Sequence, residues 1–264
     1  MLYITKEEIP MKLGLCANFD AIELAAKMGF DYLEVAFSRL AAMPEEDYQA
    51  LLAKKDSFPI PVCKANLFLP ADVKPLGPDA CEKVQREYLD KAFARASAIG
   101  IKLVVFGSGG ARKVPEGWSY ARAWKQLCDF LDLVAEYAEK YDVGVTLEPL
   151  RSAECNILNY VSEGTALCGI VNHPYITVLG DFFHMHMGSE PWDHLTRAGE
   201  KLSHIHICNP VGRLYPAPDD GYDYKTVIDL LKEMNYQGDI SVEAGTQDME
   251  KDGLAAVAAI KPLL

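Results

Sequence analysis

Hydrophobic positions along the chain fall into short runs, and these runs alternate with longer segments whose apolar residues recur at helical spacing. A short apolar run between turn residues predicts a strand, and a period of about 3.6 residues predicts a helix. Strands are predicted over residues 12–16, 32–36, 62–66, 103–106, 144–148, 176–181, 204–208 and 240–243. Helices are predicted over residues 20–28, 45–55, 78–99, 118–141, 162–172, 192–198, 224–234 and 248–260.

Strand and helix alternate eight times in this prediction, with no linker or change of composition between them. Such an order is typical of an α/β fold whose parallel strands are joined by helices. The length of 264 residues also suits one barrel, which needs about 250. We therefore predict a single (β/α)8 TIM barrel, one domain over residues 1–264. An open doubly wound sheet is the alternative, because periodicity does not show whether a sheet closes.

A glycine-rich segment, Gly107-Ser108-Gly109-Gly110, follows the fourth predicted strand. It lacks the Lys-Ser/Thr pair of a phosphate-binding P-loop, and no Gly-x-Gly-x-x-Gly follows any predicted strand. We predict a backbone turn near the functional site at this position.

The charge and composition of the chain indicate which kinds of binding partner to expect. The chain has 38 acidic and 26 basic residues, which gives a formal net charge of −12. A protein that grips nucleic acid usually presents a basic face, and no cluster of Lys and Arg stands out, so no nucleic-acid partner is expected. Half of the residues are hydrophobic, which is enough to bury a large core.

Several features together predict a cytoplasmic location. The seven cysteines are dispersed without a Cys-x-x-Cys pair, which is typical of reduced thiols rather than a disulfide framework. The N-terminal segment 1–8 lacks the basic and apolar regions of a signal peptide. No run of residues approaches the roughly eighteen apolar residues that span a membrane, so no membrane partner is expected.

Acidic and imidazole side chains gather at the ends of the last four predicted strands. Glu148 ends the fifth strand, Asp181 the sixth and Glu243 the eighth, and His206 lies near the end of the seventh. In a TIM barrel, functional residues lie at the C-terminal ends of the strands. Three carboxylates there would repel one another unless a cation lay between them. We predict one divalent metal ion held by these four residues, with Mn2+ favoured and Co2+, Mg2+ or Zn2+ as alternatives.

Four neighbouring residues need separate interpretations. His204 shares a strand face with His206 but lies deeper, so we predict an interior, hydrogen-bonded residue. Cys208 is predicted to be a small buried residue. His184 follows Asp181 by three positions and is predicted to contact substrate. Glu34, near the end of the second strand, could face the pocket, or be solvated or ion-paired.

These residues carry a resemblance to a known family. Segment 147–156 (LEPLRSAECN) looks like the EPL-N-x-x-E-T segment of the ketose 3-epimerases, the tagatose/psicose epimerase family. Segment 179–185 (LGDFFHM) resembles that family's D-x-x-H-M segment. Segments 204–206 and 240–243 match its last two ligand strands, and the family belongs to the xylose isomerase-like TIM barrel superfamily.

The resemblance implies roles for individual residues. Glu148, Asp181, His206 and Glu243 would be the metal ligands, and the two glutamates would also be the catalytic acid and base. Glu154, His184 and Arg213 would contact the substrate. The family writes the segment after the seventh strand as H-x-G-E-x-N-R. Here it reads HICNPVGR, so the acidic residue is absent and Arg213 is displaced by one position.

The chemistry that follows is proton transfer beside a carbonyl. One glutamate would remove a carbon-bound proton to give an enediolate that a bound metal stabilises, and the other would return a proton to the opposite face. We predict a sugar isomerase or epimerase, acting on a sugar, a sugar phosphate or a polyol-derived ketone. Oligomeric state stays open, although related barrels often pair through their helix faces.

Three other functions stay open. A metal-dependent lyase or deglycosidase could share the same intermediate. A non-catalytic sugar-binding barrel would need no metal and no pair of glutamates. The superfamily also contains endonuclease IV, whose extra metals rest on histidines after strands three and four. Here segments 66–70 and 106–110 contain no histidine, which argues against DNA repair.

Overall fold

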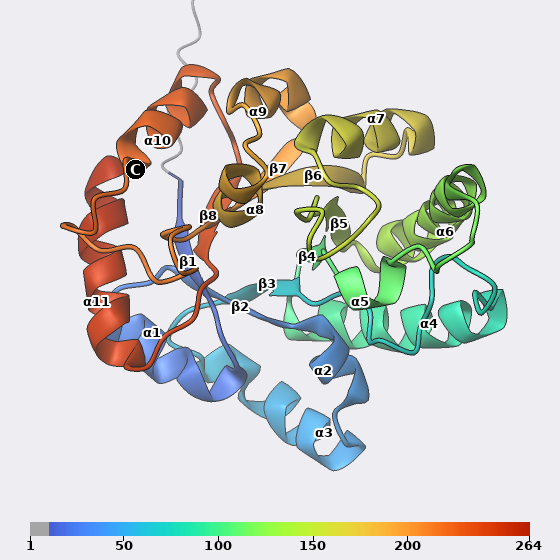
Figure 1. Cartoon of the computed structure of the whole chain (residues 1–264). Helices are drawn as coiled ribbons and strands as arrows, with labels where there is room; N and C mark the ends of the chain where they lie inside the picture. The colour runs from blue at the N-terminus through green and yellow to red at the C-terminus, as the bar shows by residue number, and fades with distance from the viewer. Residues whose placement is uncertain (1–10) are drawn as a thin grey trace, which may run out of the picture.

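Eight parallel strands close into a barrel in sequence order, as the computed structural model shows for residues 11–264 (Figure 1). The predicted barrel is therefore confirmed, and the open sheet was the wrong alternative. The prediction for segment 1–8 lies outside the described residues. The strands are β1 Leu13–Cys16, β2 Tyr32–Ala36, β3 Val62–Asn66, β4 Leu103–Phe106, β5 Gly144–Leu147, β6 Ile176–Asp181, β7 Leu202–Ile207 and β8 Asp239–Val242.

The helices form a ring around the barrel, which Figure 1 shows with the strands at its centre. Eight of the helices are those that the periodicity predicts, with ends that differ by a few residues. They are α1 Ile22–Met28, α3 Glu45–Lys54, α4 Glu82–Ile99, α6 Tyr120–Tyr141, α7 Val161–Val171, α9 Asp193–Ala198, α10 Tyr224–Glu233 and α11 Met249–Ile260.

Three further helices, none of them predicted, begin directly or almost directly after a strand. They are α2 Phe37–Ala42, α5 Gly109–Arg112 and α8 Phe182–Met187. Each has four to six residues, fewer than two turns, which leaves little of a repeating apolar pattern to mark it in the sequence. Because they follow β2, β4 and β6, they lie at the C-terminal end of the barrel, where they form part of its mouth.

The barrel interior is filled toward the N-terminal ends of the strands. Lys64 Nζ lies 2.7 Å from Asp239 Oδ2 and 4.8 Å from the centre of the Tyr32 ring. Gly14 leaves room for that ring, since a Cβ atom there would lie 2.1 Å from Tyr32 Cε2. These contacts close the barrel from below, so a ligand can reach its axis only from the C-terminal end.

Between the barrel and helices α4 and α6 lies an aromatic part of the core. The rings of Phe37 and Phe68 stack 5.3 Å apart, and Phe106 lies 5.1 Å from Phe68 and 5.9 Å from Phe130. All four are buried, so this cluster fixes strands β2 and β4 against the outer helices.

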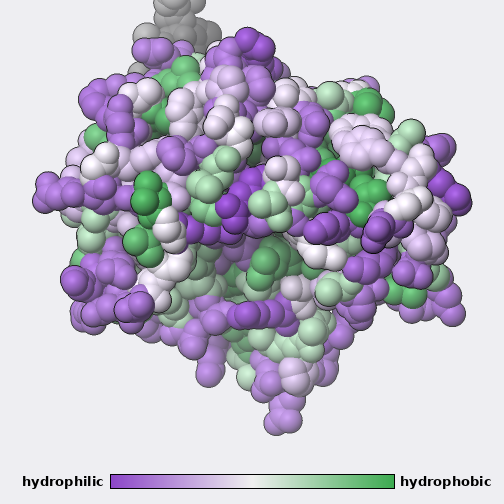
Figure 2. Space-filling view, viewed as in Figure 1, coloured by the Kyte–Doolittle hydropathy of each residue, from purple (hydrophilic) through white to green (hydrophobic). Residues whose placement is uncertain are grey.

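The surface, the helices and the cysteines can be compared with the predictions from composition. Figure 2 shows hydrophilic side chains over most of the face seen in Figure 1, with hydrophobic ones in small separate groups. In residues 11–264 no helix is both long enough and apolar enough to cross a membrane. All seven cysteines lie in this range and are free, as predicted.

Candidate active site

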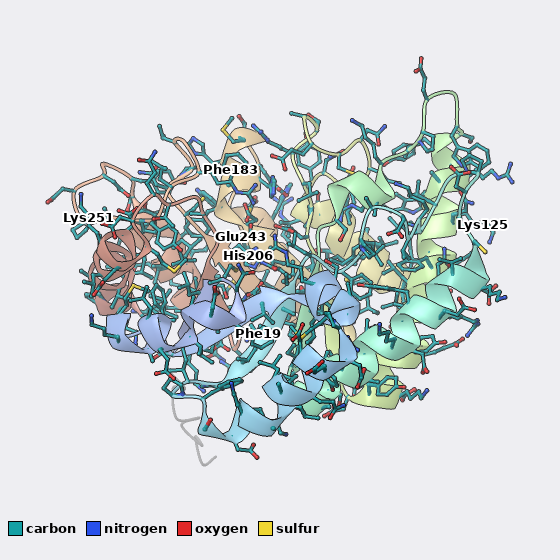
Figure 3. All side chains as sticks on the ribbon, turned by 90° about the horizontal axis from the view of Figure 1, so that it is seen from below. Phe19, Lys125, Phe183, His206, Glu243 and Lys251 are labelled. Atoms are coloured by element: carbon teal, nitrogen blue, oxygen red, sulfur yellow. The ribbon has the colours of Figure 1, made fainter. Side chains whose placement is uncertain are left out.

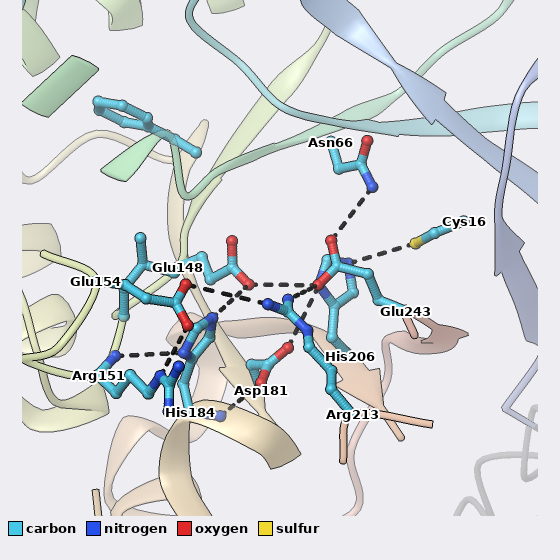
Figure 4. A network of polar contacts seen from close by, with 12 residues as sticks. Cys16, Asn66, Glu148, Arg151, Glu154, Asp181, His184, His206, Arg213 and Glu243 are labelled. Carbon is cyan, nitrogen blue, oxygen red and sulfur yellow. Dashed lines mark hydrogen bonds and ion pairs between the residues drawn. The ribbon is translucent and has the colours of Figure 1, made fainter. Parts of the chain in front are cut away.

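Four side chains from four consecutive strands meet at the mouth of the barrel. Asp181 is the last residue of β6 and pairs with His206 of β7, while Glu148 and Glu243 directly follow β5 and β8. Each offers a ligand atom within 4.8 Å of the others. From His206 Nδ1 the distances are 3.5 Å to Glu148 Oε1, 3.7 Å to Asp181 Oδ2 and 3.6 Å to Glu243 Oε2 (Figure 4).

The geometry of this cluster fits a metal ion. His206 Nδ1 and Glu148 Oε1 are buried and have no hydrogen-bond partner among residues 11–264, although buried polar atoms almost always have one. Ligands about 2.1 Å from a common ion lie roughly 3 to 4 Å from one another. The distances of 3.5 to 3.7 Å fall within this range, and mixed oxygen and nitrogen ligands suit Mn2+, Mg2+, Co2+ or Zn2+.

The far side of the His206 ring contacts Glu34, which is fully buried. Glu34 Oε1 lies 2.9 Å from His206 Nε2, and Glu34 Oε2 lies 2.8 Å from His204 Nε2. Ser241 Oγ also donates to Glu34 Oε2 at 2.7 Å. When His206 donates its Nε2 proton to Glu34, the Nδ1 lone pair is free to bind a cation.

This network decides between the interpretations of Glu34 and confirms the one of His204. The sequence left Glu34 as a residue that faces the pocket, is solvated or is ion-paired. The ion-paired alternative holds, because Glu34 lies beneath the site, paired with two imidazoles. The prediction that His204 is interior and hydrogen-bonded is confirmed, as is the burial of Cys208.

Electrostatic repulsion between the carboxylates affects the pKa values of the cluster. Burial, helped by the charges of Glu148 and Glu243, raises the pKa of Asp181 to about 6. Burial would also raise the pKa of Glu243, but the charges of His206 and Arg213 outweigh it and lower that pKa to about 2. For His206 burial favours the neutral form, yet Glu34 and Glu243 lift its pKa well above the ordinary range. A proton on His206 thus supplies part of the positive charge that the carboxylates need.

Two arginines and one aromatic ring form the outer layer of the site. Arg213 Nη2 donates to Glu243 Oε2 at 2.6 Å, and Arg151 Nε donates to Glu154 Oε1 at 2.7 Å. Both guanidinium groups lie 4.7 Å from the centre of the Phe183 ring. Figure 3 shows Phe183, Glu243 and His206 in succession near the barrel axis, with Lys125 and Lys251 far out on the helices.

His184 joins this layer to the carboxylates. It is buried on α8, and its Nε2 lies 3.8 Å from Glu148 Oε1. Its main-chain N–H donates to Asp181 Oδ1 at 2.8 Å, and its Nδ1 accepts from the main-chain N–H of Arg151 at 3.3 Å. The short helix thus begins with Asp181 as its N-cap, which orients the carboxylate and the imidazole together.

A cavity of about 300 Å³ adjoins Glu243 on the side of strands β1 to β3. Its wall includes Cys16, Asn66, Leu67 and Tyr215. Asn66 Nδ2 donates to Glu243 Oε1 at 3.4 Å, and Cys16 Sγ lies 4.0 Å from His206 Nε2. Of the four acidic and imidazole side chains, Glu243 borders this cavity, so a small molecule in the cavity would contact that carboxylate.

The structure therefore brings together every residue that the sequence singled out: Glu148, Glu154, Asp181, His184, His206, Arg213 and Glu243. Sequence reasoning missed Cys16, Asn66 and Arg151. Asn66 could have been predicted, since it is the last residue of a predicted strand. Arg151 lies three positions before Glu154, at a spacing that favours pairing.

Comparison with known proteins agrees with this geometry. The sequence is 25% identical over 241 residues to D-psicose 3-epimerase of Agrobacterium fabrum, which covers 84% of this chain and 77% of that protein. It is also 25% identical over 142 residues to fructoselysine 3-epimerase of Escherichia coli O157:H7, which covers 52% of each. These relatives are sugar epimerases, and the chain is accordingly an enzyme of the isomerase class.

Solved structures of epimerases have a similar fold. A crystal structure of D-psicose 3-epimerase in the presence of D-fructose superposes with a TM-score of 0.83 and 20% identity, covering 95% of this chain and 97% of that one. The sequence also matches the family described as Xylose isomerase-like TIM barrel over residues 22–261. The closed barrel, the convergent strand ends and this match lead to one conclusion: the chain belongs to the Xylose isomerase-like TIM barrel family.

Proposed function

We propose that this enzyme epimerises or isomerises a ketose sugar by moving a proton at the carbon beside the carbonyl, with one divalent metal ion held by Glu148, Asp181, His206 and Glu243. The observation that carries the proposal is the convergence of three carboxylate oxygens on the unpartnered Nδ1 atom of His206, at 3.5 to 3.7 Å. Mn2+ is the proposed ion. When bound, it would polarise the oxygens of the substrate and offset the negative charge that develops on them.

The two glutamates have the placement that a two-base reaction needs. Glu148 follows β5 and Glu243 follows β8, with β6 and β7 between them. Both carboxylates lie near His206 Nδ1, at 3.5 and 3.6 Å, so a substrate bound at the proposed metal ion could have one glutamate on each side of the same carbon. One removes the proton as a base and the other delivers a proton to the opposite side as an acid.

The surrounding residues set the charge of Glu243 and line the proposed substrate site. The charges of His206 and Arg213 keep Glu243 ionised, with a pKa of about 2 in the metal-free site. Glu154, His184 and Arg213 are the proposed substrate contacts, because a carboxylate, an imidazole and a guanidinium together can bind several sugar hydroxyls. The ring of Phe183, covered by Arg151 and Arg213, excludes water from this side.

A stereochemical experiment tests the proposal. The enzyme is stripped with a chelator, reloaded with Mn2+ and incubated in D2O with a panel of ketoses that includes D-psicose, D-fructose and fructoselysine. Inversion of a centre with deuterium incorporated at that carbon supports epimerisation, and movement of the carbonyl supports isomerisation. Release of water or an aglycone would instead identify the lyase or deglycosidase.

Variants separate the roles of the glutamates from general effects on folding. Glu148→Gln and Glu243→Gln should each lower kcat by about a hundredfold or more, as removal of a positioned acid or base does. Glu190→Gln is the matched control, because Glu190 is also buried but contacts His194 and the main chain of Val161. Full turnover by both site variants would show that the two-base mechanism is wrong.

A further inference from the structure

The glycine-rich segment after β4 ends in an arginine with no exposed surface. Arg112 is the last residue of α5, and its side chain is 0% exposed. Its Nη1 donates to the main-chain carbonyl of Phe106 at 2.8 Å, and its Nη2 donates to the main-chain carbonyl of Glu148 at 2.7 Å. The guanidinium thus joins the ends of β4 and β5 from behind the site.

These two carbonyls belong to the backbone that determines the position of the Glu148 carboxylate. The Phe106 carbonyl also accepts from the main-chain N–H of Glu148 at 3.1 Å, so one oxygen receives both donors. The Glu148 carbonyl precedes Pro149, whose nitrogen carries no proton and cannot continue the strand pairing. Next to Phe106 lies Gly107, where a Cβ atom would come within 2.0 Å of Glu148 Oε2. The carboxylate therefore lies directly against the peptides that Arg112 holds.

The charge of Arg112 also has no obvious partner. Within residues 11–264, no carboxylate lies within ion-pair distance of its guanidinium, and its Nε atom has no hydrogen-bond partner. Burial lowers the pKa of Arg112, while the nearby Cys155 and Glu148 raise it. A buried charge is costly unless something compensates it. The group that benefits is the carboxylate cluster at the barrel mouth, which is short of positive charge.

We propose that Arg112 is a positioning residue for Glu148: its planar guanidinium holds the Phe106 and Glu148 carbonyls together, which aims the Glu148 carboxylate at His206 Nδ1. The inference rests on the proposed metal-dependent function. A lysine cannot replace the planar guanidinium of Arg112, since its single nitrogen does not span two carbonyls in a fixed plane. A glutamine could reach one carbonyl but would remove the charge.

Arg95 provides a matched control elsewhere in the fold. It is also buried, and its Nη1 donates to the main-chain carbonyls of Leu40, Ala41 and Met43 at 3.0, 3.2 and 2.6 Å. It lies on α4 and ties that helix to the C-terminal end of α2 and, through Glu45, to α3, rather than joining the ends of β4 and β5. Arg95→Lys therefore measures how much the loss of a buried guanidinium lowers the stability of the fold when the proposed metal site is not involved.

The experiment compares Arg112→Lys, Arg112→Gln and Arg95→Lys with the parent enzyme. Melting temperature and circular dichroism report folding, competition with a fluorescent chelator reports Mn2+ affinity, and ketose turnover reports kcat and KM. All variants should melt at lower temperature. Only those at position 112 should bind Mn2+ about tenfold or more weakly, as loss of a group that orients a ligand does. They should lower kcat more than they raise KM.

A double variant tests the route through Glu148. In the Glu148→Gln background, Arg112→Lys should cause no further loss of Mn2+ affinity. Unchanged Mn2+ affinity in both position-112 variants, or equal losses in Arg95→Lys, would overturn the inference. Two variants at position 112 keep the test open if one does not fold. Mn2+ binding without ketose turnover in the parent would contradict the proposed function and leave this inference standing.

Discussion

The Nε2 atom of His206 lies 2.9 Å from Oε1 of Glu34, a carboxylate with no exposed surface. The same ring turns its Nδ1 toward the three carboxylates of the candidate metal centre. The His206 ring therefore lies between the buried carboxylate of Glu34 and the three carboxylates that would bind the metal ion. Its orientation and its tautomer are both set from below, by a residue on β2 that no substrate touches.

Glu34→Gln should weaken Mn2+ binding by about 10- to 100-fold, the usual cost of losing the carboxylate behind a ligand histidine. The amide has the same shape, so the loss would come from the charge and the proton on Nε2. Competition with a fluorescent chelator measures the affinity. Tyr32→Phe is the control, because the Tyr32 hydroxyl contacts Ser241 rather than the histidine. Equal affinity for Mn2+ in Glu34→Gln would contradict the proposed role.

Mn2+ binding should release protons, and the number should depend on pH. In the metal-free site the pKa of His206 is well above its ordinary range and that of Asp181 is about 6. Both must lose their protons to bind a cation. About one proton should be released at pH 7 and nearly two at pH 5.5, so affinity rises with pH, about tenfold per unit near neutrality.

Calorimetry in buffers with different ionisation enthalpies counts these protons. His173→Gln is a suitable control, because His173 is partly exposed and its charged neighbour is Glu139. It should give the same proton counts as the parent enzyme. A release close to zero at pH 7 would mean that His206 is neutral before the metal binds.

Gly107→Ala should lower kcat far more than it lowers stability. The added methyl group would lie 2.0 Å from Glu148 Oε2 and would push the carboxylate off its position. A misplacement of about 1 Å can cost about a hundredfold in rate. Gly110→Ala is the control, since a Cβ atom there meets nothing within 4 Å. Steady-state kinetics should show its kcat within about twofold of the parent value, and equal effects at the two positions would contradict the explanation.

Arg213→Lys should separate substrate contact from metal binding. Lysine keeps a positive charge beside Glu243 but loses the fork that binds two oxygens at once. We expect kcat/KM for the ketose to fall by about tenfold, mainly through KM, while Mn2+ affinity changes by less than about twofold. Arg197→Lys, on the surface of α9 and paired with Asp193, should change neither. A large loss of Mn2+ affinity would assign Arg213 to the metal centre instead.

The sequence predicted the barrel and the four convergent side chains because both depend on local pattern. Each strand is an apolar run, and each candidate ligand stands at or near the end of one, so alternation and position suffice. The same reasoning could not identify Glu34 as the partner of His206. The two residues are 172 positions apart, and their contact depends on how side chains fill the barrel interior.

The role proposed for Arg112 could not be predicted from the sequence, for a related reason. Nothing in the spacing of a Gly-Ser-Gly-Gly-Ala-Arg segment shows that its last side chain turns under β5. That depends on the short helix α5, whose four residues are too few for a periodic signal. The Arg213 loop illustrates the opposite case. The departure from the family pattern was visible, and the structure shows that the displaced arginine still reaches Glu243.

The division of the barrel into two halves has an evolutionary consequence. All four proposed ligands lie on or directly after strands β5 to β8, whereas the cavity beside Glu243 also includes residues at the ends of β1, β2 and β3, among them Cys16, Ala36 and Asn66. Mutations in the loops after β1, β2 and β3 can therefore change the shape of this cavity while the four proposed ligands stay in place. New substrate ranges could arise within this lineage, or be selected in the laboratory, by diversifying three loops while the second half of the chain is kept constant.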